Sequence, residues 1–349
     1  MSSYRTPAQI PLAVNGAMIS IPFWSRRALV SYSAVFLLTA CGPLVTAFGQ
    51  TPEPVDILRI DSDLVNLNVS VFNRLTSTSM ANLQQKDFAV IDNGVSQEIT
   101  FFASGDAPFD LVLLLDLSGS TSDKIGLIRK SSKRFVDATR PDDRIAILTF
   151  AAEIRSVSRF TSDHAVLKRS IDEIERPIGG TNFWDALRFV LEHVVNQSRA
   201  EHRRSAIIVM TDGVDNALPD VFGEGSRATT FEELLEAERR SETIVLPIYL
   251  DTEKESNPRS TPPGAYSMAR EQLAMLAAES GNTLYRAQKV KDLQGVYEQI
   301  IRDLGTVYSI GYRPTNRVRD GSWHNVTVQV VGRSDLSLRT KRGYYESKH

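Results

Sequence analysis

The sequence predicts an α/β protein whose main domain is a doubly wound, mostly parallel sheet, accompanied by a smaller β-sandwich domain. Between residues 107 and 305, short apolar runs alternate with longer segments of helical periodicity. This alternation is typical of a parallel sheet with helices on both faces. Outside that range, apolar and polar residues alternate with a period of two, which indicates half-buried strands.

The elements of the main domain follow one another at regular intervals. Strands are expected at residues 111–115, 144–150, 154–160, 206–211, 244–250 and 283–286, with 154–160 at an edge. Helices are expected at residues 124–139, 164–175, 182–196, 231–240, 267–280 and 290–304. In such sheets, ligands bind at the carboxyl ends of the strands. The residues that directly follow 111–115 and 206–211 are therefore the first candidates for a site.

Two β segments flank the main domain, at residues 57–104 and 306–346. In the first, Asp92-Asn93-Gly94 is a turn signal, because these residues tolerate positive φ. In the second, the alternating strands are interpreted as a hairpin that ends near Tyr344 and Tyr345. We expect the two segments to form one thin sandwich. The strands expected in them lie at residues 65–71, 88–91, 99–102, 326–330 and 336–338.

Residues 1–50 have the pattern of an export signal or membrane anchor. Arg26 and Arg27 precede the apolar run 28–40, as the charged and hydrophobic regions of a signal do. Three outcomes stay open: lipidation at Cys41, which ends a tetrapeptide similar to a bacterial lipoprotein processing box; cleavage after Gly49; or no cleavage, because residues 28–49 are long enough to span a bilayer. All three predict a protein exported to the periplasm or cell envelope, anchored or secreted.

Composition and charge narrow the classes of function. The apolar fraction of 42% and the charged fraction of 23% are those of an ordinary globular protein. The formal net charge of −2 gives no reason to expect a nucleic-acid partner, which normally needs a basic face. The only cysteine is Cys41, within the predicted signal, so disulfides and thiolate catalysis are excluded for the folded part.

Hard oxygen ligands lie directly after two predicted strands and in one loop. Asp116, Ser118 and Ser120 occupy alternate positions after the first strand, Thr181 follows two glycines, and Asp212 stands in Thr-Asp-Gly. One tight turn can aim the first three side chains at the same point. Carboxylate and hydroxyl oxygens suit a hard divalent cation, Mg²⁺ above all, with Ca²⁺ or Mn²⁺ as alternatives.

This ordered set resembles the metal-ion-dependent adhesion site of von Willebrand factor A domains, such as integrin I domains. The pattern there is Asp-x-Ser-x-Ser, a distant Thr, and a distant Asp in Thr-Asp-Gly, and all five positions are filled here. The resemblance covers residues 107–305 and implies a Rossmann-like fold. With its flanking β segments, the whole chain is similar to the exported bacterial family with a von Willebrand factor A-related domain, known mostly from Acidobacteria.

The resemblance implies a role for each matched residue. Ser118, Ser120 and Thr181 would bind the metal directly, whereas Asp116 and Asp212 would act through water or exchange into direct contact. Because neutral hydroxyls leave much of the cation's charge uncompensated, an Asp or Glu carboxylate of a protein partner would fill the open position. The implied function is adhesion or assembly through metal-dependent protein–protein interaction, not catalysis.

Each residue also has a simpler interpretation. Ser118 and Ser120 are common helix-capping residues, Thr181 is a candidate N-cap for the helix at 182, and Asp212 suits a turn. Asp116 is harder to explain in this way, since a carboxylate after five apolar residues needs a partner.

Two other functions compete with the adhesion hypothesis. A Mg²⁺-dependent phosphohydrolase of the haloacid-dehalogenase kind also places an Asp after a buried strand, but its second carboxylate, the acid/base, is here Ser118. A structural envelope module with an unused metal site is the other alternative.

Overall fold

The structure, a computed structural model, describes residues 64–76, 78–119, 121, 124–175, 179–196, 198, 203–215, 229–254, 261, 263–316 and 320–346. All of them belong to one compact unit, Ile60–His349. The predicted signal or anchor at residues 1–50, with Cys41, and the candidate ligand Ser120 lie outside the described residues.

A six-stranded sheet forms the centre of the main domain, with the strand order β10-β9-β8-β5-β6-β7. Its neighbouring strands are parallel except for β6 and β7, which are antiparallel, so β7 is the edge strand that the sequence predicted. The predicted α/β fold class is therefore confirmed. The strands are β5 (Phe109–Asp116), β6 (Arg144–Phe150), β7 (Ile154–Thr161), β8 (Arg204–Thr211), β9 (Ile244–Leu250) and β10 (Tyr285–Ala287).

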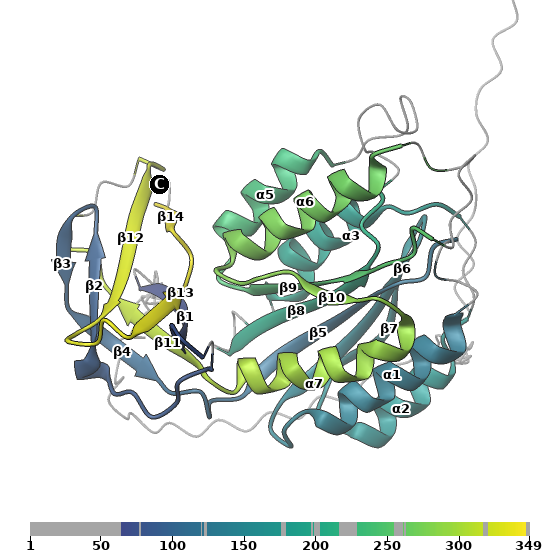
Figure 1. Ribbon diagram of the computed structural model, residues 1–349, viewed down its shortest axis with the longest axis horizontal. Coiled ribbons are helices and arrows are strands. Elements are labelled where there is room, and N and C mark those ends of the chain that lie inside the picture. Colours follow the sequence, from purple (N-terminus) through teal and green to yellow (C-terminus); the bar gives the residue numbers. More distant parts are fainter. Residues whose placement is uncertain are drawn as a thin grey trace, which may run out of the picture. The chain divides into compact units, whose positions relative to one another are not determined.

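Helices cover both faces of this sheet, as Figure 1 shows. Alternate residues of β5 supply the two cores: Leu111, Leu113 and Leu115 pack on one side, and Val112 and Leu114 on the other. The first side is covered by α1 (Ile125–Ala138), α2 (His164–Asp172) and α7 (Leu293–Leu304), which follows the short helix Val290–Asp292. The second side is covered by α3 (Phe183–Phe189), α5 (Phe231–Arg240) and α6 (Ala265–Glu279).

One predicted helix differs from the structure. Instead of continuing to residue 196, α3 ends at Phe189 and gives way to a π-helical turn, Val190–Val194. Most apolar residues of both stretches are buried against the same core: Phe183, Trp184, Ala186 and Leu187 in α3, and Val190 and Leu191 in the turn. Hydrophobic periodicity reports which side of a helix is buried, and over so short a stretch it does not separate the two hydrogen-bonding patterns.

The flanking segments form two four-stranded antiparallel sheets that enclose a third core. One has the order β13-β1-β11-β4 and the other β14-β12-β2-β3, so strands from both chain ends are mixed in each. The strands are β1 (Val65–Asn73), β2 (Phe88–Asp92), β3 (Val95–Gln97), β4 (Ile99–Ala103), β11 (Val307–Tyr312), β12 (Trp323–Val330), β13 (Leu336–Arg339) and β14 (Gly343–Tyr345), with a 3-10 turn at Gln85–Asp87.

The predicted C-terminal hairpin is wrong. β12 pairs with β2 and β14, whereas β13 pairs with β1 in the other sheet. The intervening turn is itself tied to other segments: Val331 N donates to Asp87 O, and Arg74 N donates to Asp335 O. The turn therefore carries the chain from one sheet to the other, where the apolar side chains of both strands reach the same core.

A buried polar network joins these two sheets. The Asp92 carboxylate accepts hydrogen bonds from the hydroxyls of Tyr312 (2.9 Å) and Tyr344 (3.0 Å), and it lies 2.9 Å from Nδ1 of His324. Tyr312 belongs to one sheet and the other three residues to the other. Three protein side chains thus form hydrogen bonds with the buried Asp92 carboxylate, as a buried polar group requires.

Arg204 holds the two chain crossings between the main domain and the antiparallel sheets. Its guanidinium donates to Val307 O (2.8 Å), Gly105 O (3.2 Å) and Ala107 O, and it stacks on the Phe109 ring. The two crossings also touch: a Cβ on Gly105 would lie 2.0 Å from Gly305 O. Only glycine fits at residue 105.

We therefore expect Gly105→Ala to lower the free energy of unfolding by about 1–3 kcal/mol, because overpacking forces the two crossings apart. Urea denaturation measures the change. Gly126→Ala is the matched control: a Cβ there meets no atom within 4 Å, and in α1 alanine should add about 0.5–1 kcal/mol of stability. Equal effects of the two substitutions would contradict the close approach at Gly105.

The C-terminal segment is anchored on α5 by Lys341. Its Nζ donates to Glu238 O (2.9 Å), Arg239 O (3.1 Å) and Ser241 O, at the carboxyl end of the helix, where a cation also complements the helix dipole. The fully buried Glu238 carboxyl group makes no side-chain hydrogen bond of standard geometry within the described residues. Burial raises the pKa of Glu238 well above its ordinary value of 4.5, although Lys341 acts in the opposite direction.

A raised folded-state pKa means that Glu238 favours the folded state below pH 4.5 and loses that contribution as the pH rises. Relative to wild type, Glu238→Gln should therefore gain stability as the pH rises from 4.5, by up to about 1.4 kcal/mol per pH unit until the folded-state pKa is reached. Urea titrations between pH 4.5 and pH 7, below the Lys341 pKa of about 8, test this. Parallel pH profiles of the two proteins would rule it out.

Candidate functional site

Two buried carboxylates stand at the carboxyl ends of neighbouring strands. Asp116 is the last residue of β5, and Asp212 directly follows β8, which pairs with β5 in parallel. Their exposed fractions are 0% and 1%. The structure therefore brings these two predicted site residues to the same edge of the sheet, where parallel α/β sheets bind ligands.

Both oxygens of Asp116 are held by hydrogen bonds. Oδ2 accepts from the Thr211 hydroxyl (2.6 Å), and Oδ1 accepts from the Ser118 backbone N–H (2.8 Å). Burial and the nearby Asp212 carboxylate raise the pKa of Asp116 to about 7, although hydrogen bonds from Ser118 and Thr211 act in the opposite direction. A divalent cation beside the two carboxylates would instead lower the pKa of Asp116, because a nearby positive charge favours the charged carboxylate.

Asp212 is held in the same way. Oδ2 accepts from the Thr252 hydroxyl (2.8 Å), and Oδ1 accepts from the Val214 N–H (3.2 Å), which closes a turn. Gly213 has a φ of +74°, and a Cβ there would lie 2.9 Å from Leu273 Cδ1 in α6. The interpretation of Asp212 as a turn residue is thus correct but incomplete. Its Oδ2 accepts from Thr252, which follows the neighbouring strand β9.

Ser118 is buried in the turn after β5 and does not cap α1. The N-cap of that helix is Lys124, which has no side-chain capping bond. The turn is closed by Thr121, whose N–H donates to Ser118 O (3.0 Å) and whose hydroxyl donates to Asp116 O (2.7 Å). Ser118 is thus a buried residue of the turn beside Asp116 and not a cap of this helix.

Thr181 is buried in a loop that is fastened to the end of β6, the other neighbour of β5. Asn182 donates to Ala151 O from its backbone N–H (2.9 Å) and to Ala152 O from its side chain (2.8 Å). Gly179 has a φ of +129°, and a Cβ there would lie 2.6 Å from Ala152 Cβ. The N-cap of α3 is Asn182, so Thr181 is not the cap that its position suggested.

Three residues outside the predicted set organise this edge: Thr211, Thr252 and Asp215. The first two hold the carboxylates, and Asp215 Oδ2 accepts from the Trp184 N–H (2.9 Å), joining the start of α3 to the loop after β8. Asp215 therefore links the Thr181 segment to the Asp212 segment. In the sequence, the only signal for it is that Asp often caps helices, and nothing local indicates which helix.

The donor chemistry of this edge fits a hard cation. The candidate ligands are hydroxyls and carboxylates, with no soft sulfur. Across the described ranges, no group of three or more His, Cys, Asp or Glu side chains is arranged to hold a metal ion. A cation here would thus depend on serine and threonine oxygens beside the two carboxylates.

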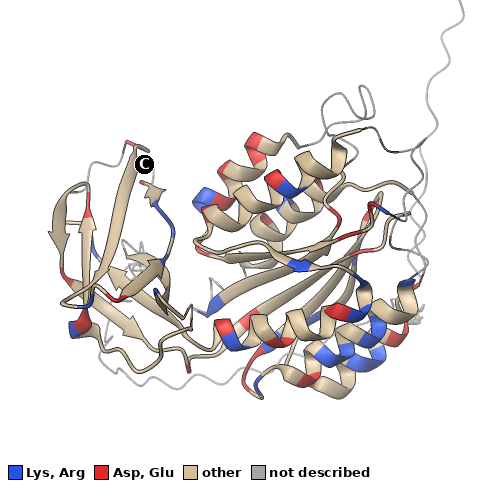
Figure 2. Cartoon of the chain, in the orientation of Figure 1, with Lys and Arg blue, Asp and Glu red and all other residues tan. Residues whose placement is uncertain are grey.

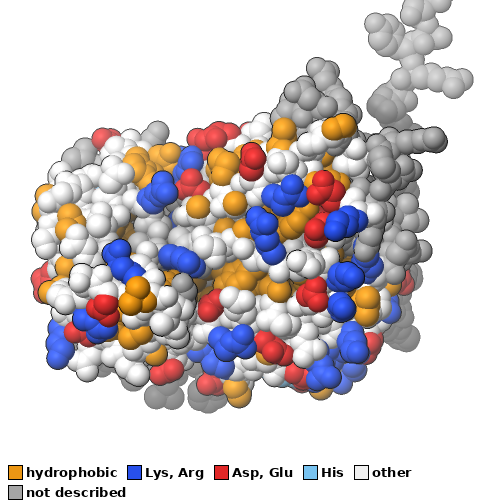
Figure 3. Space-filling model, viewed as in Figure 1, with side chains coloured by type: hydrophobic (Ala, Val, Ile, Leu, Met, Phe, Trp, Pro, Cys, Tyr) orange, Lys and Arg blue, Asp and Glu red, His pale blue; other side chains and the backbone are white. Residues whose placement is uncertain are grey.

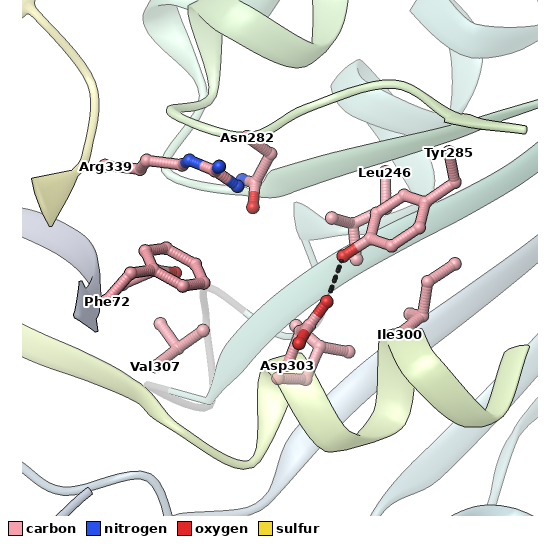
Figure 4. A pocket seen from close by; sticks show the side chains of 10 residues that line it. Phe72, Leu246, Asn282, Tyr285, Ile300, Asp303, Val307 and Arg339 are labelled. Atoms are coloured by element: carbon pink, nitrogen blue, oxygen red, sulfur yellow. Dashed lines mark hydrogen bonds between the residues drawn. The ribbon is translucent and has the colours of Figure 1, made fainter. Parts of the chain in front are cut away.

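A separate pocket lies near the amino ends of β9 and β10, away from the carboxyl edge of the sheet (Figure 4). There the Tyr285 hydroxyl donates to Asp303 Oδ2 (2.7 Å), and the other walls include Phe72, Ile300 and Val307. Burial raises the pKa of Tyr285, and the adjacent Asp303 adds to the effect, so the phenol stays neutral and donates. None of the predicted site residues lines this pocket.

Removing the Asp215 carboxylate tests the link between the two site segments. We expect Asp215→Ala to cost about 1 kcal/mol of stability and to speed amide hydrogen exchange of residues 179–184, because the Trp184 N–H loses its acceptor. Asp163→Ala is the control, since Asp163 caps α2 through Ala165 and Val166. It should cost about as much without affecting residues 179–184, and unchanged exchange in Asp215→Ala would refute the link.

The chain is similar to several proteins of known structure. Solved structures similar to this chain include proximal thread matrix protein 1 from the mussel byssus with a zinc-occupied MIDAS motif (19% identity, TM-score 0.45, 61% of this chain and 49% of that one). A second is BatB from Bacteroides thetaiotaomicron (18% identity, TM-score 0.41, 56% of this chain and 98% of that one). A third is the von Willebrand factor domain of the pilus tip protein Mfa5 from Porphyromonas gingivalis (17% identity, TM-score 0.40, 57% of this chain and 95% of that one). The chain spans about half the length of the mussel protein.

The family model of the von Willebrand factor type A domain matches residues 110–299, which is more than half of the chain. The match contains the parallel sheet and the strand ends described above. The resemblance predicted from Asp116, Thr181 and Asp212 is confirmed at the level of the family: this chain belongs to the von Willebrand factor type A domain family.

Proposed function

We propose that this protein is an exported binding module that holds a divalent cation at the carboxyl edge of its sheet and captures a carboxylate of a protein partner through it. Ser118, Ser120 and Thr181 bind the cation, with Asp116 and Asp212 acting through water or exchanging into direct contact. Mg²⁺ is the expected ion, and Ca²⁺ and Mn²⁺ are the alternatives. The main domain is proposed to extend over residues 107–305, with the β segments 57–104 and 306–346 as its companion.

The observation that carries this proposal is a difference in ion pairing between the buried carboxylates at the two ends of β5. At the start of β5, the fully buried Asp110 pairs with Arg144 and Arg203. At its end, Asp116 and the adjacent Asp212 are equally buried, but within the described residues no Lys, Arg or His forms an ion pair with either. Buried charges in proteins are paired or coordinate metals, so a cation supplies the missing partner.

The same arrangement explains why the site would bind a protein instead of only an ion. Neutral hydroxyls compensate less of the +2 charge than carboxylates do, and the ion keeps strong Lewis acidity at an open position. A partner's Asp or Glu then gains direct coordination in a water-poor interface, which offsets the cost of removing it from water. The glycines at 119, 179 and 180 let the backbone pass close to the cation.

The enzyme alternative does not match the sequence directly after β5. The residue two positions after Asp116 is Ser118, where a phosphohydrolase of the kind considered would need a second carboxylate. The described histidines have contacts in other places: His164 with Thr139, His193 with Phe189, and His324 with Asp92. We therefore favour binding over catalysis.

Surface charge gives no argument for a nucleic-acid partner. Figure 2 shows Lys and Arg gathered on α1 and α2, where Lys133 pairs with Asp172 and Lys168 with Asp137. On the face drawn in Figure 3, positive and negative side chains are interspersed. Within the part of the chain that the structure describes, no helix has the length and apolarity needed to cross a bilayer. The anchor proposed for residues 28–49, and lipidation at Cys41, concern residues outside that part.

Substitution of Asp116 tests the proposed function directly. We expect the wild-type protein to bind Mg²⁺ in calorimetric titrations and Asp116→Ala to lose that binding, because the cation loses a charge that holds it, while circular dichroism shows an intact fold. Asp172→Ala, which removes an exposed carboxylate on α2, is the control and should bind like wild type. Unchanged Mg²⁺ affinity in Asp116→Ala would refute the assignment.

Partner capture and catalysis are separated by two further measurements on the same proteins. Binding of acidic peptides should require Mg²⁺, disappear with a chelator or with Asp116→Ala, and fail for peptides in which Asn and Gln replace Asp and Glu. Metal-dependent turnover of a phosphoester such as p-nitrophenyl phosphate would instead favour the enzyme alternative. Metal binding without any peptide binding would favour the structural module.

A further inference from the structure

The strand β9 reaches the candidate cation site although it carries no residue of the matched pattern. Two residues after its end, Thr252 is 1% exposed, and its hydroxyl donates to Asp212 Oδ2 at 2.8 Å. β9 pairs in parallel with β8, so Thr252 approaches Asp212 from the neighbouring strand end. This contact joins residues that are 40 positions apart in the sequence.

The contact of Thr252 repeats the arrangement around the other carboxylate. Asp116 is held by one threonine hydroxyl, from Thr211, and one backbone N–H two residues further along. Asp212 is held by one threonine hydroxyl, from Thr252, and again by the backbone N–H two residues further along. These donors fix the plane of each carboxylate, and a carboxylate oxygen has lone pairs enough to contact a cation or its water as well.

Thr252 is itself held in place by its surroundings. Its Oγ1 lies 3.4 Å from the hydroxyl oxygen of the buried Tyr266, in the first turn of α6. On either side of it, Asp251 N donates to Ala287 O (3.0 Å), and Glu253 accepts from Arg270 (3.0 Å). These contacts fix the position of the Thr252 hydroxyl. A hydrogen-bond donor in a fixed position orients the carboxylate that accepts from it.

We infer that Thr252 is a positioning residue for the cation site, which fixes the orientation of Asp212. The inference rests on the proposed function. Without the hydroxyl, Asp212 Oδ2 is buried with one donor fewer and is free to rotate away from the cation. Loss of a residue that orients a metal-binding group typically weakens metal affinity about 10- to 100-fold.

The test compares three substitutions in the full exported chain. Thr252→Val keeps the shape and removes the hydroxyl, and Thr252→Ser keeps the hydroxyl. Thr243→Val is the matched control: Thr243 is also buried, just before β9, and bonds Ser205 Oγ at 2.8 Å, at the opposite end of the same two strands. The readouts are dissociation constants for Mg²⁺ and Mn²⁺ by calorimetry, and urea unfolding in the presence of a chelator.

We expect Thr252→Val to bind both ions about 10-fold or more weakly, Thr252→Ser to stay close to wild type, and Thr243→Val to bind like wild type even if it is less stable. Should valine prevent folding, Thr252→Cys replaces it, since a thiol of similar size donates poorly, and it should bind more weakly than Thr252→Ser. This pattern separates orientation of Asp212 from a general loss of stability, which both strand-end threonines would share.

Two outcomes would overturn the inference while leaving the proposed function intact: wild-type affinity in Thr252→Val, or equal weakening in Thr252→Val and Thr252→Ser, which would assign the effect to packing. A wild-type protein that binds neither ion would overturn the proposed function, and the role of Thr252 with it.

Discussion

The repulsion between Asp116 and Asp212 is the constraint around which the carboxyl edge of the sheet is organised. Both carboxylates are buried at adjacent strand ends, where desolvation and the repulsion of Asp212 oppose ionisation of Asp116. The protein keeps them there with Thr211, Thr252 and two backbone N–H groups. These donors do not neutralise the charge, and this is the reason for proposing a cation at this edge.

Other buried carboxylates in the same chain show that this arrangement is selective. Asp110 is neutralised by two arginines, and Asp92 is surrounded by two phenols and a histidine. Glu238, in α5, is another buried carboxylate with little direct compensation, and burial raises its pKa well above 4.5. What distinguishes Asp116 and Asp212 is that they adjoin hydroxyl-bearing turns and glycines at the strand ends.

The main domain supplies the rigidity that such a site requires. Buried residues on both sides of β5 and β8 fix the strand ends, and helices pack on both faces (Figure 1). The crossings to the antiparallel sheets are clamped by Arg204 and by the contact of Gly105 with Gly305. Positions set by backbone pairing and close packing vary little, and a cation site depends on ligand positions held to fractions of an ångström.

The sequence alone determined the order of strands and helices in the main domain and the residue types that end each of its strands, because hydrophobic periodicity and turn chemistry are local. In the flanking segments it did not indicate β3 or β11. It misassigned the pairing of β12 with β13, since alternation shows which residues are buried and not which strand lies alongside. Only the tertiary structure decided that Thr252 holds Asp212 and that Asp215 joins α3 to the loop after β8. Both are single hydrogen bonds between segments distant in the chain, and the geometry of such a bond is created by the packing of the whole sheet.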